Sequence, residues 1–153
     1  MNALDLIEAT DIVRQLPSNF HEQIASTKWK DKVELLTDCL KVLEGKPKIV
    51  DNPELSSYVS ALAARMKDVN VLVVQNSAAM IAALATGVEN RGFGKYRSVV
   101  MPPILDRLKE KKTMDALGNT LDAVFSSVSD GLSLHQRLDI LKIRKIHRLP
   151  SRK

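Results

Sequence analysis

The chain has 153 residues, of which 44% are apolar, 27% charged and only 4% aromatic. This length is typical of one domain that buries a core without disulfide or metal staples, and the single Cys39 excludes an internal disulfide. We expect no signal peptide, because the N-terminus is acidic and lacks an apolar segment. We also expect no membrane span, because no run is apolar for long enough.

The net charge of +5 is concentrated at the C-terminus. Residues 134–153 hold seven basic residues and one acidic residue, so they carry +6 and residues 1–133 sum to −1. A nearly neutral body does not indicate a nucleic-acid-binding fold. The basic segment by itself is suited to a polyanion, such as nucleic acid, lipid head groups or an acidic protein surface.

Apolar residues recur at helical spacing along the chain, and no segment of useful length alternates as a strand would. A short helix is expected over residues 18–25, with Ser18 as its N-cap. Five longer apolar stripes follow, at residues 33–43, 55–66, 74–85, 101–108 and 117–125. Pro102 and Pro103 lie in the fourth stripe, so that helix is expected to begin near Pro102 or to bend there. The pattern predicts an all-α fold.

The predicted helices are paired by short turns. These turns lie at residues 27–31, 68–70 and 109–113, with centres about 41 residues apart, close to the HEAT-repeat period of ~40–47 residues. The spacing predicts an α-solenoid of about three HEAT-type helical hairpins plus a C-terminal basic helix or tail. We expect the three turns to lie along one edge. The predicted organisation is a lead-in at residues 1–16, a repeat domain at 17–130 and a basic segment at 131–153.

No pattern of an enzyme or a metal site is found in the sequence. His21, His135 and His147 have no partner at zinc-like spacing, and no serine lies in a nucleophile elbow. The fragment at Gly92 and Gly94 lacks the preceding strand and the third glycine of a dinucleotide site. We therefore predict no enzymatic activity, no cofactor and no metal.

The first turn contains the only tryptophan, Trp29, in the run Thr27-Lys28-Trp29-Lys30-Asp31-Lys32. One interpretation is an aromatic anchor on a protein-recognition surface, because Trp and basic residues are common at binding hot spots. The other is a Trp that folds back over the first helix pair. Position alone leaves both interpretations open.

The other two turns are Asp68-Val69-Asn70-Val71 and Lys109-Glu110-Lys111-Lys112. A single Lys-rich turn is usually only solvated. Three turns on one edge, one with Trp and two with several lysines, favour a binding edge for an acidic protein surface.

These strings resemble a known family. Residues 4–128 are similar to the N-terminal half of a TOG domain, the tubulin-binding HEAT-repeat array of microtubule polymerases of the Dis1/ch-TOG family, and most resemble a second TOG domain. The resemblance is carried by Leu4-Asp5-Leu6-Ile7-Glu8-Ala9-Thr10-Asp11-Ile12-Val13, Lys28-Trp29-Lys30-Asp31, Asp68-Val69-Asn70-Val71 and Leu105-Asp106-Arg107-Leu108-Lys109-Glu110-Lys111-Lys112.

The resemblance implies a module of a microtubule-associated protein that binds curved, unpolymerised αβ-tubulin through its intra-repeat turns. The edge with Trp29 would face β-tubulin, and the later turns would face α-tubulin. The residues expected to bind tubulin are Trp29, Lys30, Val69, Asn70, Lys109, Lys111 and Lys112. The implied location is the cytoplasmic cytoskeleton, at microtubule ends, the spindle, the spindle pole or the centrosome. The basic tail adds a second expected contact, with a polyanion or the microtubule lattice.

The chain departs from the family in length. A family TOG domain has six HEAT repeats, whereas this chain is expected to have three and lacks the later contact turns. We therefore expect weaker tubulin binding than a full domain gives, and no polymerase activity from this chain alone. The alternative is a general HEAT-repeat scaffold without tubulin specificity, in which truncation of Trp29 has little effect on binding.

Overall fold

A computed structural model describes residues 7–110, 117–118, 120, 122–125 and 138. Within these residues every named element is a helix, in the order η2 (Ile12–Arg14), α1 (Phe20–Ile24), α2 (Trp29–Leu43), α3 (Leu55–Ala64), η3 (Arg65–Lys67), α4 (Val71–Gly87), η4 (Glu89–Tyr96) and α5 (Arg97–Arg107). The η elements are 3₁₀ helices. Residues 117–118, 120 and 122–125 are also helical. The predicted all-α fold is confirmed.

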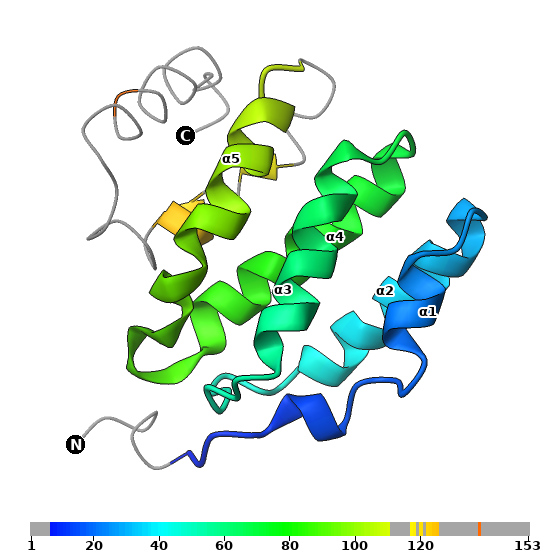
Figure 1. Ribbon diagram of the computed structural model, residues 1–153. Coiled ribbons are helices and arrows are strands. Elements are labelled where there is room, and N and C mark those ends of the chain that lie inside the picture. The colour runs from blue at the N-terminus through cyan, green and yellow to red at the C-terminus, as the bar shows by residue number, and fades with distance from the viewer. Residues whose placement is uncertain (1–6, 111–116, 119, 121, 126–137, 139–153) are drawn as a thin grey trace.

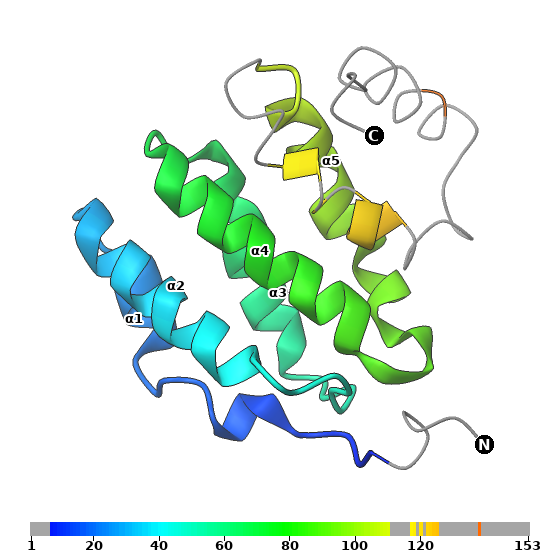
Figure 2. The ribbon, with the colours of Figure 1, turned by 180° about the vertical axis from the view of Figure 1, so that it is seen from behind.

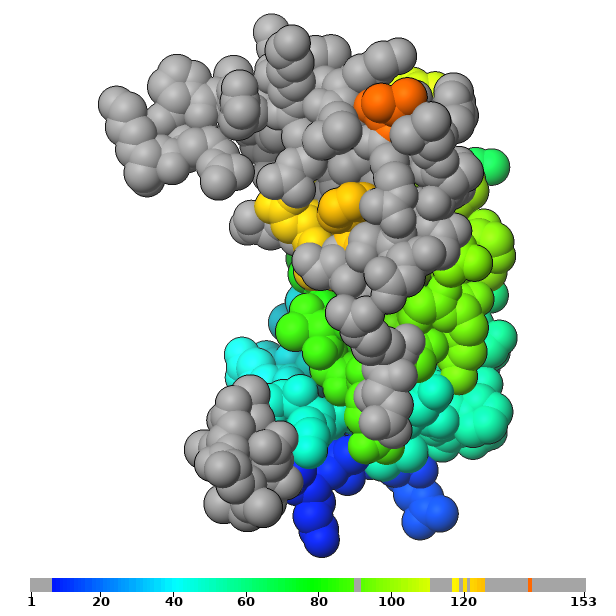
Figure 3. Space-filling view, turned by 90° about the vertical axis from the view of Figure 1, so that its left-hand side faces the viewer, coloured from blue at the N-terminus to red at the C-terminus, as the bar shows by residue number. Residues whose placement is uncertain are grey.

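The helices stack as pairs in chain order. α1 packs on α2 and α3 on α4, while α2 contacts α4 and α3 contacts α5, so α1, α3 and α5 form one layer and α2 and α4 the other. Figures 1 and 2 show this stack from its two sides. In Figure 3 the described residues run from blue at the bottom to yellow-green near the top, in the order of the repeats. The arrangement is that of a HEAT-type α-solenoid.

The predicted apolar stripes form one continuous core. Among its fully buried members are Leu36, Leu62, Ile81 and Ile104, and the core extends to Leu117 and Val124 of the last pair. In α2 the buried face is rotated from the predicted one. Leu35 and Cys39 are buried there, whereas Val33 and Leu40, which the stripe over residues 33–43 was expected to bury with Leu36 and Leu43, are only partly buried. The rotation follows from α2 packing against both α1 and α4.

Two helix starts differ from the predictions. The predicted cap at Ser18 is wrong, because α1 begins at Phe20 after Asn19, whose amide donates to Gln23 Oε1 instead of capping the helix. Of the two alternatives for the fourth stripe, a start near Pro102 is wrong. The helix α5 begins at Arg97, directly after η4, and both prolines lie inside it. Pro102 and Pro103 have no N–H to donate to the carbonyls of Ser98 and Val99, and both of these residues are exposed, so water has access to them.

The connections between pairs lie at the edge opposite the turns (Figure 1). The Ile49 N–H donates to Gly87 O at 2.8 Å, and the Thr10 N–H donates to Lys48 O at 2.9 Å, so the lead-in and both connections are bonded side by side. A Cβ at Gly87 would lie 2.6 Å from Ile49 Cδ1, so a larger residue there would displace the Ile49 side chain. This bonding fixes the register of successive pairs. In the described residues no helix is long and apolar enough to cross a membrane.

Cys39 provides a test of the core. Its side chain is fully buried, and burial, with a smaller contribution from Asp38, raises its pKa to about 12. Since the thiolate is the reactive form, we expect Cys39 to resist Ellman's reagent at pH 8 in the native chain and to react rapidly in denaturant. Rapid reaction of the native chain would contradict this packing.

Candidate protein-binding edge

The three intra-pair turns lie along one edge of the stack, as Figures 1 and 2 show from opposite sides. The first turn joins α1 to α2, the second joins η3 to α4, and the described start of the third follows α5. We call this surface the turn edge and define it as residues 25–30, 65–72 and 108–110. The shared edge expected from the sequence is thus present. Lys111 and Lys112 lie outside the described residues.

Trp29 is the first residue of α2, and 42% of its side chain is exposed. The Lys30 ammonium lies 5.8 Å from the centre of the indole ring, within the range of a cation–π contact. The turn before it is fixed by Ser26, whose hydroxyl accepts from the Lys28 N–H and donates to the Asp31 carboxylate. Trp29 therefore stands at a defined place on the rim of the turn edge.

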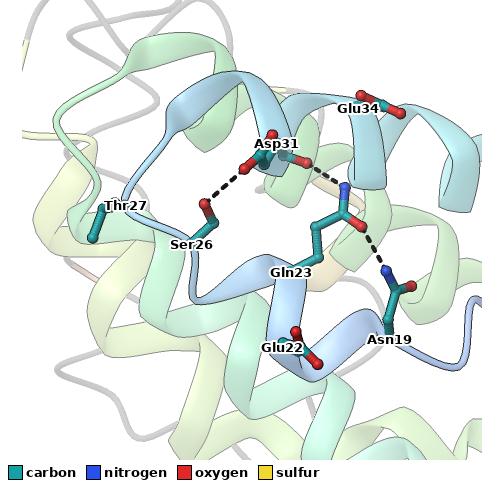
Figure 4. A pocket seen from close by; sticks show the side chains of 7 residues that line it. All are labelled: Asn19, Glu22, Gln23, Ser26, Thr27, Asp31 and Glu34. Carbon is teal, nitrogen blue, oxygen red and sulfur yellow. Dashed lines mark hydrogen bonds between the residues drawn. The ribbon is translucent and has the colours of Figure 1, made fainter.

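The inner side of the first turn is held by a chain of polar contacts, which Figure 4 shows in a pocket formed by α1 and the start of α2. Gln23 donates to the backbone carbonyl of Asp31 at 2.8 Å and accepts from Asn19 at 2.9 Å. Glu22 and Glu34 also line this pocket. These contacts make the first turn rigid and leave its basic and aromatic side chains for the turn edge.

The second turn presents apolar side chains to solvent. Val69 is 92% exposed and Leu72, in the first turn of α4, is 47% exposed. Asn70 is the N-cap of α4, and its side-chain oxygen accepts from the N–H groups of Leu72 and Val73. Asn70 therefore has a structural role in addition to its expected role in binding. Exposed apolar residues side by side are typical of a contact surface.

A buried ion pair links the first two turns. Lys32 Nζ lies 2.6 Å from Asp68 Oδ2, and the two side chains are only 11% and 9% exposed. Lys32 belongs to the Lys-rich run of the first turn, which was expected to lie on the binding edge, yet its side chain is nearly buried. Burial raises the pKa of the Asp68 carboxyl, but hydrogen bonds from Lys32 and Asn70, with the charges of Lys32 and Arg65, outweigh it. The pKa therefore lies below its usual value.

This shift predicts a dependence of stability on acid. The folded pKa of Asp68 is below its unfolded value of about 4, so the unfolded state binds more protons in acid. The stabilisation is fully present above the unfolded pKa and is lost as pH falls through the folded pKa. Urea unfolding at several pH values should show a steeper loss of stability below about pH 4 in the wild type than in Asp68→Asn. Equal slopes would contradict the assignment.

A groove runs between the first two turns, with a volume of about 610 Å³. Both turns contribute to it, and its lining consists of Thr27, Trp29, Lys32, Ala64, Arg65, Lys67, Asp68, Val69 and Asn70. Three of these residues are basic and one is acidic, so the groove favours an acidic partner. Arg65 and Lys67 were missed in the sequence, as was Leu72. Leu72 lies outside the apolar stripe of its helix, so its exposure could have been predicted from the sequence.

The third turn is described only as far as Glu110. Lys109 Nζ lies 3.6 Å from Asp106 Oδ1, and both side chains are largely exposed. Such a pair contributes little to stability and leaves the ammonium accessible. Within the described residues, no group of three or more His, Cys, Asp or Glu side chains is placed to hold a metal ion.

No family model matches the chain, but curated proteins do. The spindle pole body component alp14 of Schizosaccharomyces pombe is 37% identical over 127 residues, which are 82% of this chain and 16% of that protein. The protein mini spindles of Drosophila melanogaster is 34% identical over 132 residues, 84% of this chain and 6% of that protein. The chain thus spans a small part of the length of these relatives.

Solved structures match almost the whole chain. A structure from work on tubulin recruitment and assembly by microtubule polymerases with TOG domain arrays matches with a TM-score of 0.76 and 27% identity. That match covers 96% of this chain and 33% of the other. A structure from work on microtubule plus end tracking by XMAP215, CLIP-170 and EB1 matches with a TM-score of 0.77 and 31% identity, over 93% of this chain and 58% of the other.

The fold and the turn edge define the class as a HEAT-repeat α-solenoid with an exposed edge of intra-repeat turns. Its homologues are proteins of the Dis1/ch-TOG family, its structural neighbours are TOG domain structures, and the chain has the fold of a partial TOG domain. The family consists of microtubule-associated proteins rather than enzymes.

Proposed function

We propose that the chain binds unpolymerised αβ-tubulin through the turn edge, as a module of a regulator of microtubule growth. The observation that carries the proposal is the groove between the first two turns, where exposed Trp29 and Val69 stand among basic side chains. A related solved structure, 27% identical, comes from work on tubulin recruitment by microtubule polymerases. Aromatic and apolar residues on a rigid, basic edge suit an acidic protein partner.

The proposed orientation places the edge with Trp29 and Lys30 toward β-tubulin. Val69 and Asn70 would contact the same subunit from the second turn. The later turn, with Lys109, Lys111 and Lys112, would lie toward α-tubulin. The order of the turns along one edge (Figure 1) supports contact with both subunits of an elongated dimer.

The remaining parts of the proposal concern location and the ends of the chain. Relatives are named a spindle pole body component and, in Dictyostelium discoideum, centrosomal protein 224. We propose a cytoskeletal location at microtubule ends, the spindle and its poles. The proposed division keeps residues 1–16 as a lead-in, 17–130 as the TOG-like unit and 131–153 as a basic segment that contacts the microtubule lattice or another polyanion.

Titration of labelled tubulin with the chain tests the proposal against a general scaffold. We expect saturable binding to unpolymerised dimer and weaker binding as ionic strength rises, because a basic edge meets an acidic surface. An unrelated acidic protein of similar net charge is the control. Equal binding of both proteins would favour a scaffold or polyanion binder, and no binding by a folded chain would refute the proposal.

Val69 offers a variant that separates binding from folding. Because 92% of its side chain is exposed, Val69→Asp should change the free energy of unfolding by less than about 0.5 kcal/mol. It places an acid against an acidic partner, so we expect tubulin affinity to fall about tenfold. Parallel urea unfolding and tubulin titration check the two effects. An unchanged affinity would remove Val69 from the proposed interface.

A further inference from the structure

We infer that Lys32 and Asp68 are positioning residues, which hold the Trp29 turn and the Val69 turn in the relative placement that binding requires. The expected effect on tubulin affinity rests on the proposed function, whereas the expected effect on the placement of the two turns concerns this chain alone. Neither residue is offered as a contact with the partner, because both side chains are nearly buried in the floor of the groove.

The geometry joins both turns through one carboxylate. Lys32 follows Trp29 by three residues, so the two share a face of α2 and both line the groove. Asp68 Oδ2 accepts from Lys32 at 2.6 Å, and Asp68 Oδ1 accepts from the Asn70 N–H at 2.9 Å. Asn70 in turn caps α4. A continuous path of bonds therefore runs from the first turn of α2 to the start of α4.

Val69 lies between the two anchored residues of this path. With Asp68 bonded to Lys32 and Asn70 bonded to the start of α4, the backbone on both sides of Val69 is fixed. This restraint explains how an apolar side chain stays 92% exposed beside an open groove. A second link remains, because Arg65 Nη1 donates to the Ile24 carbonyl at 3.1 Å, so loss of the ion pair should loosen the placement of the second turn relative to Trp29.

Stability alone is a poor reason for this pair. Removing two charges from water offsets most of their attraction, and apolar residues of similar volume often serve the fold equally well. The two residues are 36 apart in sequence, and each lies close to an exposed residue of the proposed interface, Trp29 or Val69. The pair is therefore well placed to set the position of one turn relative to the other. Removal of the pair should therefore change the placement of the two turns even in a variant that is as stable as the wild type.

The decisive variant is Lys32→Met/Asp68→Leu, which removes both charges and keeps similar volumes. Trp29 is the only tryptophan in the chain, so acrylamide quenching of its fluorescence reports on the first turn without a partner. We expect the quenching constant to rise, by up to about twofold because 42% of the side chain is already exposed. We also expect tubulin affinity to fall at least tenfold, with an unfolding temperature within about 5 °C of the wild type.

A control lies at the opposite edge, where Lys95 Nζ is 2.7 Å from Asp51 Oδ1 in a partly exposed pair. Lys95→Met/Asp51→Leu should change neither quenching nor affinity. If the Lys32/Asp68 variant does not fold, Asp68→Asn supplies the same readouts, because its amide oxygen still accepts from the Asn70 N–H. Unchanged Trp29 quenching in a folded variant would overturn the inference, and so would an equal change in the control.

The two proposals fail in different ways. If the wild type does not bind tubulin while quenching responds as expected, the proposed function is wrong and the positioning role stands. If the wild type binds tubulin and the folded Lys32/Asp68 variant binds equally well, the positioning role is wrong and the proposed function stands.

Discussion

Replacement of Trp29 by alanine is expected to weaken tubulin binding about 30-fold or more, the effect of losing a hot-spot residue worth about 2 kcal/mol. The side chain is partly exposed on the rim of the groove and carries a cation–π contact with Lys30. It is the largest side chain lining the groove, and the exposed part of its surface is available for desolvation by a partner. Titration of labelled tubulin with both chains measures the difference.

The control for Trp29→Ala is Val99→Ala. Val99 is also a partly exposed apolar residue, but it lies on α5 in a different surface depression, beside Pro102 and Pro103. We expect Val99→Ala to leave affinity within about twofold of the wild type, and both variants to retain their helical circular dichroism. A Trp29→Ala chain that binds as tightly as the wild type would favour the general scaffold.

The second large effect is expected in the core. Leu62 is fully buried in α3, and Leu62→Ala should lower the free energy of unfolding by about 2–5 kcal/mol through lost burial and the cavity that remains. A single domain has only about 5–15 kcal/mol of stability, so this change leaves a marginal fold. Urea unfolding followed by circular dichroism measures the loss.

Leu72→Ala is the matched control for the core variant, because it makes the same chemical change at a position that is 47% exposed. Its effect on unfolding should stay below about 1 kcal/mol. Equal losses from Leu62→Ala and Leu72→Ala would contradict the assignment of buried and exposed faces.

The helical pairing could be predicted from the sequence because it depends on local signals. Apolar residues at helical spacing and turns about 41 residues apart are sufficient to indicate stacked hairpins. The exposure of Trp29 could not be predicted in the same way, because its position in the sequence left open whether the side chain is exposed or folds back, and the structure leaves it 42% exposed. The helices and their pairing can be predicted without knowing which side chains are in contact in the folded chain.

The rest depends on contacts between distant residues. Lys32 and Asp68 are 36 residues apart, and nothing in the sequence indicates that they form a pair. The buried Lys32 therefore could not be distinguished from the solvated lysines beside it. The face of α2 that is buried depends on its two neighbouring helices. The start of α5 was left open between a beginning and a bend at Pro102, because prolines are common at helix starts. The observed start lies five residues before Pro102, where η4 leads into this helix.

Tubulin binding by this chain is tested most directly by size-exclusion chromatography of the chain mixed with unpolymerised αβ-tubulin. We predict that the chain leaves its own elution position and co-elutes with tubulin, and that raised salt reverses the shift. Protection of Cys39 from Ellman's reagent, measured on the chain alone before mixing, verifies that the chain is folded. If a folded chain elutes separately from tubulin at low salt, even when the chain is in large excess over tubulin, the proposed function is wrong.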